Sequence, residues 1–337
     1  MPRRVAAVAS GAGLRHRKGH RPPAIRLGTK FAAAAAGVLA AVAGCSSPRP
    51  APLPGQHRMP AAHGITAVGG SQVQPVAPAL FSPGACVAFA PTQGNRGQTV
   101  FLDAGHGGVD PGGTGTTMAG AAIDEAQVNL SIELDTAALL RSRGYRVVAS
   151  RTRQTTVIRL TPAMISGGLL TAAGVRDDVA ARDRCANMAG AAILIGIYLN
   201  AFPGGAGCVT DYDASRTFSA GNRMLATMLQ RDVLAAMNAR GWGIPDGGVQ
   251  PDTSMGSAIT AADQAYGHLM LLGPAKAGYF TRPSHMPGAL IEPLFVTDPF
   301  EASIAASAQG QHVIAMGIAE AVDQYLASTS KRAAVQR

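Results

Sequence analysis

The sequence predicts an α/β domain in which a mostly parallel, open sheet carries helices on both faces. Two observations predict this class: strand-like apolar runs alternate with helix-length segments, and glycines follow the strands. The first unit runs from the apolar TVFLDAG through the helical EAQVNLSIELDTAALLRSRG to the apolar YRVVAS, over residues 99–150. This order is typical of parallel strands that are joined by covering helices.

The same alternation continues along the chain. A helix is expected over 175–191, a strand in AILIGIYLNAF (192–202), a short strand in GCVTDYD and a long amphipathic helix over 219–240. Two further strands are expected in HLMLLGP (268–274) and ALIEPLF (289–295), before a last helix over 309–328. We therefore expect one catalytic domain over 98–328 and a basic tail over 329–337.

The N-terminal part has the composition of a targeting segment and a tether. Eight basic residues and no acidic residue lie in residues 1–30, before the apolar run FAAAAAGVLAAVAGC. This order is typical of a bacterial signal peptide, predicted over 1–44, and Val-Ala-Gly-Cys resembles a lipobox that would leave Cys45 lipidated. The alternative is an ordinary cleaved signal with an incidental cysteine. Residues 45–97 are rich in Pro, Gly and Ala, so a flexible linker is expected, with the apolar segment GACVAFAP (84–91) as a candidate exception.

The charge distribution limits the classes of binding partner, and the cysteine content limits the number of disulfides. The formal charge of +9 falls to about +1 without the eight N-terminal basic residues, so a nucleic-acid groove is not expected. A signal peptide would direct the protein to the cell envelope, which is an oxidising compartment where disulfides form. Three cysteines besides Cys45, namely Cys86, Cys185 and Cys208, allow at most one internal disulfide, whose pairing the sequence leaves open. The cysteine spacing does not match a zinc knuckle.

Four residues with catalytic or ligand chemistry lie at strand ends or at a helix start: His106, Glu125, Tyr198 and Glu292. Ligands gather beyond the carboxyl ends of the strands in open α/β sheets. His106 lies in a glycine-rich turn that would leave its imidazole accessible, and Asp103 is the expected acceptor for its second nitrogen. The glycines lack the lysine and hydroxyl residue of a phosphate loop.

Read together, these segments resemble the zinc-dependent N-acetylmuramoyl-L-alanine amidases of the amidase-3 type. VFLDAGHGGVDPGG resembles the family's opening strand and first-ligand motif, and DEAQVNL resembles its second-ligand segment. RDRCANMAGAAILIGIYLNA, with Arg182, is similar to the helix and strand that carry the third ligand. MPGALIEPLFVTDPFEA resembles the strand that carries the catalytic glutamate. The matches occur in the same order over about 200 residues.

The resemblance implies that His106 and Glu125 bind one Zn²⁺ ion and that Glu292 transfers protons. At the third-ligand position the family has histidine, whereas this chain has Tyr198 in the segment GIYLN. A tyrosine must lose a proton of pKa near 10 to ligate, so weaker zinc binding is expected, and a core role for Tyr198 is an equal alternative. His268, His285 and His312 are the remaining candidates for a replacement ligand within the domain.

The implied function is hydrolysis of the amide bond between muramic acid and L-alanine in peptidoglycan. The alternative is a weak or inactive module that binds wall peptides or regulates a partner hydrolase. In both cases we expect a monomer in the cell envelope that binds peptidoglycan stem peptides and muramic acid. It would be secreted, or attached through Cys45 to the outer face of the cytoplasmic membrane.

Overall fold

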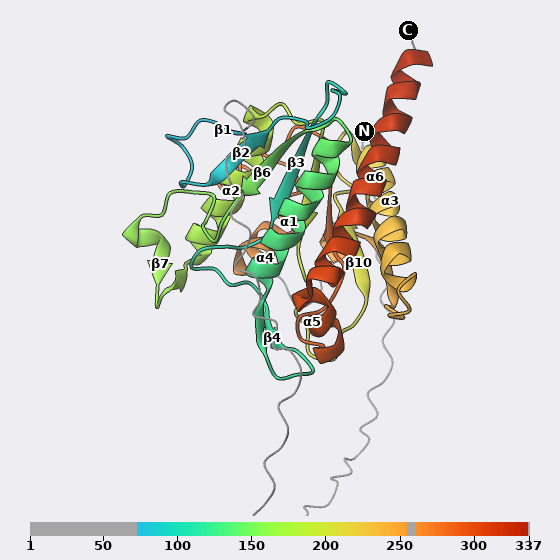
Figure 1. The fold of residues 1–337 in the computed structure, drawn as a ribbon. Helices are drawn as coiled ribbons and strands as arrows, with labels where there is room; N and C mark the ends of the chain where they lie inside the picture. Colours follow the sequence, from blue (N-terminus) through green and yellow to red (C-terminus); the bar gives the residue numbers. More distant parts are fainter. Residues whose placement is uncertain (1–72, 255–259, 336–337) are drawn as a thin grey trace, which may run out of the picture. The chain divides into compact units, whose positions relative to one another are not determined.

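One sheet forms the centre of the computed structural model, which describes residues 73–254 and 260–335 (Figure 1). Its strand order is β1-β2-β6-β3-β9-β12-β10-β11. The strands are β1 (Val73–Pro75), β2 (Ala85–Phe89), β3 (Thr99–Ala104), β6 (Arg146–Arg151), β9 (Ile193–Ile197), β10 (Cys208–Tyr212), β11 (Asp246–Pro251) and β12 (Gly288–Glu292). Two small hairpins, β4 (Thr114–Thr116) with β5 (Ala122–Asp124) and β7 (Ile165–Ser166) with β8 (Leu169–Leu170), lie outside this sheet.

The four central strands run parallel, as the sequence predicts. β6, β3, β9 and β12 pair in parallel, and their carboxyl ends therefore lie at one edge of the sheet. β10 runs antiparallel to β12, which sends the ends of β10 and of its parallel neighbour β11 to the opposite edge. This reversal separates two groups of strand-end residues.

Helices cover both faces of the sheet (Figure 1). Strand residues alternate between the faces, so Val100 and Leu102 pack with α1, α3 and α6, whereas Phe101 packs with α2. Every described helix is too short or too polar to span a bilayer. The helices are α1 (Glu125–Ser142), α2 (Ala172–Met188), α3 (Ser219–Asn238), α4 (Ala261–Tyr266), α5 (Pro299–Ala306) and α6 (Ala308–Val335), with short 3₁₀ turns at Pro162–Met164 and Asp252–Ser254.

The boundaries differ from the sequence prediction at both ends. The expected linker over 45–97 is wrong from residue 73 onward, because β1 and β2 extend the sheet and β2 is fully buried against β6. The last helix also extends beyond its expected end at residue 328, because α6 continues to Val335. Residues 1–72, with the predicted signal peptide and Cys45, lie outside the described residues.

The predicted strand HLMLLGP is wrong as well. Residues 268–274 instead form turns after α4, with the Leu269 carbonyl accepting bonds from the amides of Leu272 and Gly273. Leu271 and Leu272 are buried, so the apolar run reflects burial rather than sheet pairing. A short apolar run alone does not distinguish these two situations.

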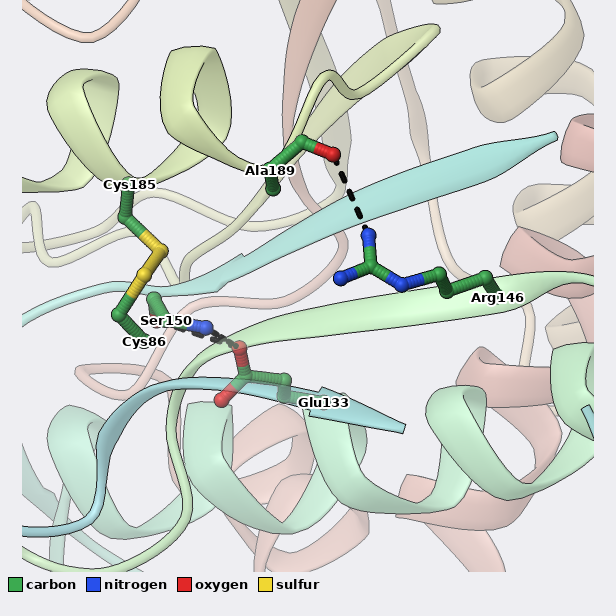
Figure 2. The surroundings of a disulfide bond; sticks show 6 residues. All are labelled: Cys86, Glu133, Arg146, Ser150, Cys185 and Ala189. Atoms are coloured by element: carbon green, nitrogen blue, oxygen red, sulfur yellow. Dashed lines mark hydrogen bonds between the residues drawn. A yellow bond between two sulfur atoms is a disulfide. The ribbon is translucent and has the colours of Figure 1, made fainter. Parts of the chain in front are cut away.

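A disulfide joins Cys86 of β2 to Cys185 of α2 (Figure 2). It closes a sequence separation of 99 residues, and Cys208 remains a buried free thiol. Beside it, the Ser150 amide of β6 donates to Glu133 of α1 (Figure 2). The disulfide therefore connects the outer strand β2 to α2, the helix that carries Arg182.

Loss of this disulfide should lower the free energy of unfolding by about 2–5 kcal/mol, because the unfolded chain regains the entropy of a long closed loop. Urea denaturation of the Cys86→Ala/Cys185→Ala double variant and of the wild type measures the difference. Reducing agent should destabilise the wild type by a similar amount and leave the double variant unchanged. Equal sensitivity of both proteins to reduction would contradict the assignment.

Candidate metal and catalytic site

The four site residues predicted from the sequence line one cavity of about 330 Å³. His106 follows β3, Glu125 begins α1, Tyr198 follows β9 and Glu292 ends β12. The parallel central strands bring these positions to the same edge of the sheet. The sequence order of the motifs therefore corresponds to one site in space.

The turn after β3 directs the His106 ring between two carboxylates. His106 has a left-handed backbone with φ of 61°, and its Nδ1 lies 2.9 Å from Asp110 Oδ2. Its Nε2 lies 3.3 Å from Glu125 Oε2. Backbone hydrogen bonds between Gly107 and Asp110 close the turn and bring Asp110 to the ring. The expected partner, Asp103, is wrong, because its carboxylate binds Arg182 and Tyr198 instead.

The backbone at Gly112 lies so close to His106 and Glu125 that only glycine fits there. A Cβ atom at Gly112 would lie 2.6 Å from His106 Cδ2 and 2.7 Å from Glu125 Oε2. Gly112 also has φ of 68°, a conformation that other residues adopt at a cost. This glycine therefore allows the loop to enclose the imidazole and the carboxylate.

Glu125 is a buried carboxylate with both oxygens held. Oε1 accepts hydrogen bonds from the Leu199 amide at 3.0 Å and from Asn129 Nδ2 at 3.1 Å, and Oε2 accepts from the Gly113 amide at 2.8 Å. Burial would raise the pKa of Glu125, but His106 and these backbone donors outweigh it and lower the pKa below its usual value. Glu125 is therefore anionic and fixed in direction.

His106 carries the matching charge. Burial opposes the imidazolium, but Glu125 and Asp110 outweigh burial and raise the pKa of His106 to about 10. The two carboxylates thus create a position at which positive charge is favoured. Because Asp110 holds Nδ1, Nε2 is the nitrogen directed at Glu125.

The donor atoms fit zinc at two positions. Ligands at 2.0–2.1 Å from a tetrahedral ion lie about 3.3 Å apart, which matches the 3.3 Å between His106 Nε2 and Glu125 Oε2. Within residues 73–254 and 260–335, no further His, Cys, Asp or Glu joins His106 and Glu125 to form a group of three possible metal ligands. His268, His285 and His312 are not among the residues that line this cavity.

Tyr198 lies beside His106 with its hydroxyl committed elsewhere. The two rings meet edge to face with centroids 5.5 Å apart, and the Tyr198 hydroxyl donates to Asp103 Oδ2 at 3.1 Å. Burial and the Asp103 charge raise the pKa of Tyr198 well above its usual value. The neutral phenol is therefore favoured over the phenolate that a metal would need.

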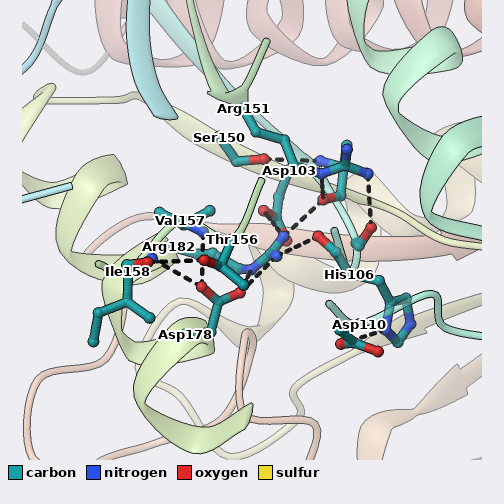
Figure 3. Close-up of polar contacts among 12 residues, drawn as sticks. Asp103, His106, Asp110, Ser150, Arg151, Thr156, Val157, Ile158, Asp178 and Arg182 are labelled. Atoms are coloured by element: carbon teal, nitrogen blue, oxygen red, sulfur yellow. Dashed lines mark hydrogen bonds and ion pairs between the residues drawn. The ribbon is translucent and has the colours of Figure 1, made fainter. Parts of the chain in front are cut away.

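Arg182 connects Asp103, the acceptor of the Tyr198 hydroxyl, to the turn after β3 (Figure 3). Its guanidinium donates to Asp103 Oδ1 and Asp178 Oδ2, each at 2.8 Å. It also donates to the carbonyls of Ala104 and His106, each at 2.7 Å. One buried cation therefore holds two carboxylates and the backbone of His106.

Glu292 faces the cavity from the end of β12. Its Oε2 accepts a hydrogen bond of 2.7 Å from Asn200 Nδ2, while Asn200 Oδ1 accepts from the Ala201 amide at 2.9 Å. Burial, Asp211 and Glu125 raise the pKa of Glu292 well above its usual value. A carboxyl group of this kind can hold a proton near neutral pH and release it during a reaction.

Two positioning residues were missed in the sequence. Asp110 is the partner of His106, and the glycines between them were the available signal, because such a turn can reverse within four residues. Asn200, the partner of Glu292, is the last residue of the segment GIYLN, and no local pattern connects it with Glu292. The side chains of the cavity wall include the apolar Leu170, Val175, Val179, Leu269, Met270, Leu271 and Leu290.

Comparison with known families now adds to this geometry. The family model of the amidase-3 type, described as N-acetylmuramoyl-L-alanine amidase, matches residues 100–324. The match covers well over half of the chain and includes all four predicted site residues. No curated protein matches the chain.

Several solved structures are similar. Cwp6 from Clostridium difficile is 20% identical with a TM-score of 0.49, and the match covers 68% of this chain but only 29% of that one. The CwlD amidase from Clostridioides difficile, in complex with the GerS lipoprotein, is 21% identical over 68% of this chain and 99% of that one, with a TM-score of 0.52. An N-acetylmuramoyl-L-alanine amidase from Clostridium difficile 630 is 27% identical over 68% and 97%, with a TM-score of 0.48.

Replacing Arg182 with methionine should destabilise the fold strongly. The Arg182→Met variant leaves Asp103 and Asp178 buried without their cation, so the free energy of unfolding should fall by about 3–5 kcal/mol in urea denaturation. The exposed pair of Arg231 and Asp232 provides the control, and Arg231→Met should change stability by less than about 1 kcal/mol. Similar small losses in both variants would argue against the network.

Proposed function

Because this chain belongs to the N-acetylmuramoyl-L-alanine amidase family, we propose that it hydrolyses the amide bond between N-acetylmuramic acid and the L-alanine of peptidoglycan. The convergence of His106, Glu125 and Glu292 on one cavity carries this proposal. A pure binding module would have little need for a proton-transferring carboxyl group beside a pair of metal-ligand side chains. No serine or cysteine nucleophile is required.

His106 Nε2 and Glu125 Oε2 are the proposed zinc ligands, and the metal ion would take the place of the proton on Nε2. Asp110 orients the imidazole from Nδ1, and the Leu199 and Gly113 amides orient the carboxylate. When bound here, zinc would polarise the scissile carbonyl and lower the pKa of a water molecule. Proton transfer and the positioning of the substrate would then depend on the protein side chains.

Glu292 is the proposed general base and acid. As a carboxylate it accepts a proton from the attacking water, and as the resulting carboxylic acid it delivers this proton to the amide nitrogen, which leaves as the amine of L-alanine. Asn200 holds Oε2, so Oε1 is the oxygen left to exchange this proton. The apolar side chains of the wall enclose the peptide and exclude water from the reacting groups.

A second candidate function follows from Tyr198. Its hydroxyl is bound to Asp103, which leaves two ligands where hydrolytic zinc sites usually have three. This observation favours a weakly active protein or a module that binds stem peptides without cleaving them. Both candidates place the protein at peptidoglycan as an envelope monomer, and the proposed lipid anchor at Cys45 is common to both.

The Glu292→Gln variant should lose release of L-alanine peptides from purified muropeptides by at least about a hundredfold, because glutamine cannot transfer the proton. Product analysis by mass spectrometry measures this loss. Glu133→Gln is the matched control: Glu133 is also buried, and burial raises its pKa to about 8, but it lies away from the cavity. An inactive wild type would favour the binding module, whereas equal activity of wild type and Glu292→Gln would rule out Glu292 as the proton-transferring group.

Substitutions at Tyr198 should separate its two possible roles. Tyr198→His should raise zinc affinity at least about tenfold, because it adds an imidazole near His106. Tyr198→Phe should leave zinc affinity unchanged, because the hydroxyl that it removes binds Asp103. Competition with a zinc-binding dye measures both affinities. A clear loss of affinity in Tyr198→Phe would instead identify the tyrosine as a ligand.

A further inference from the structure

A second group of metal-ligand side chains lies at the opposite edge of the sheet. Asp213 follows β10 and Asp252 follows β11, and these strands pair in parallel with Tyr212 opposite Pro251. The two carboxylates therefore leave adjacent strand ends side by side. His268, after α4, reaches them from a different segment, and the three side chains place ligand atoms within 4.8 Å of one another.

The charges of this group are not balanced by the protein. Asp213 and Asp252 are both 0% exposed. Among the described residues, His268 is the only basic side chain within 4.0 Å of either carboxylate. The Arg216 guanidinium donates to the carbonyls of Leu272, Gly273 and Ser284 instead. Two buried carboxylates with a single imidazole are costly unless further positive charge compensates them.

The imidazole nitrogen lies close to one oxygen of each carboxylate. His268 Nδ1 lies 3.1 Å from Asp213 Oδ2 and 3.1 Å from Asp252 Oδ2. Both distances are close to the separation of about 3.3 Å between two ligands of a tetrahedral zinc ion. Asp213 Oδ1 accepts hydrogen bonds from the amides of Ser215 and Arg216, and Oδ2 faces His268 with the Ser215 hydroxyl 3.2 Å away.

From this geometry we propose that Asp213, Asp252 and His268 bind a divalent metal ion at a second site, distinct from the site of His106 and Glu125. Two carboxylates, a neutral imidazole and a divalent ion sum to zero charge. The imidazole nitrogen favours Zn²⁺ over Mg²⁺ or Ca²⁺, which prefer oxygen ligands.

The position of this site suggests a structural role. His268 directly precedes Leu269, Met270 and Leu271, which line the catalytic cavity. A metal held by Asp213 and Asp252 would attach this wall to the ends of β10 and β11. The segment has little regular structure of its own, so a metal link would replace the backbone pairing that it lacks.

The test measures bound zinc in the full chain carrying His106→Ala and Glu125→Ala, which removes the first site. The protein is treated with a chelator, equilibrated with Zn²⁺ and freed of unbound metal before elemental analysis. We expect about one zinc ion per chain, and a loss of at least about tenfold in affinity when Asp252→Asn is added. Saturating zinc should also raise the Tm of the background variant by about 5 °C, but not that of the Asp252→Asn variant.

The matched control is His312→Gln in the same background. His312 contacts Asp135, a single exposed carboxylate, so its loss should leave the zinc content unchanged. Absence of zinc from the background variant would overturn the proposal, even if Asp252→Asn fails to fold. Equal zinc in the Asp252→Asn and His312→Gln variants would also overturn it, as would X-ray absorption with a zinc–sulfur distance near 2.3 Å.

These measurements are independent of amidase activity. A wild type that binds two ions, one of them lost with His106 and Glu125, supports both sites. A single ion that persists without His106 and Glu125 supports the second site and argues against zinc at the first. A single ion lost with that pair supports the first site and overturns the second.

Discussion

The buried guanidinium of Arg182 is the contact on which the arrangement of the candidate site depends. It lies between Asp103 of β3 and Asp178 of α2, and it also binds the carbonyl of His106. Asp178 in turn accepts hydrogen bonds from the amides of Val157 and Ile158. A strand, a helix and a loop are thus fixed relative to the imidazole by one side chain. Lysine could not replace it, because an ammonium group lacks the planar fork that serves both pairs of acceptors.

This network also explains what Tyr198 does in the fold. Asp103 has one oxygen on Arg182, and the tyrosine hydroxyl satisfies the other. The residue at position 198 therefore acts on two neighbours at once, the imidazole through its ring and the carboxylate through its hydroxyl. A ligand role and this supporting role compete for the same oxygen.

The sequence predicted the centre of the sheet, because β3, β6, β9 and β12 are compact apolar runs ended by polar or glycine residues. Strand β1 was not predicted, and β2 was marked only as an apolar exception within the linker, because the surrounding Pro and Gly residues obscure their short pattern. At the site, motif order predicted the convergence of His106, Glu125 and Glu292. The contact between Tyr198 and Asp103 depends on the register that places Asp103 opposite Gly196, which no local pattern encodes.

Strands β1 and β2 lie before residue 100, where the match to the family begins, yet Cys86 bonds them covalently to α2. The two strands shield β6, whose backbone would otherwise form an open sheet edge able to pair with another chain. The outermost strand has only three residues and ends at Pro75, which makes it a poor template for further pairing. A fragment that begins at the family boundary would therefore expose the unpaired backbone of β6. It would also leave Cys185 of α2, beside the candidate site, without its disulfide partner.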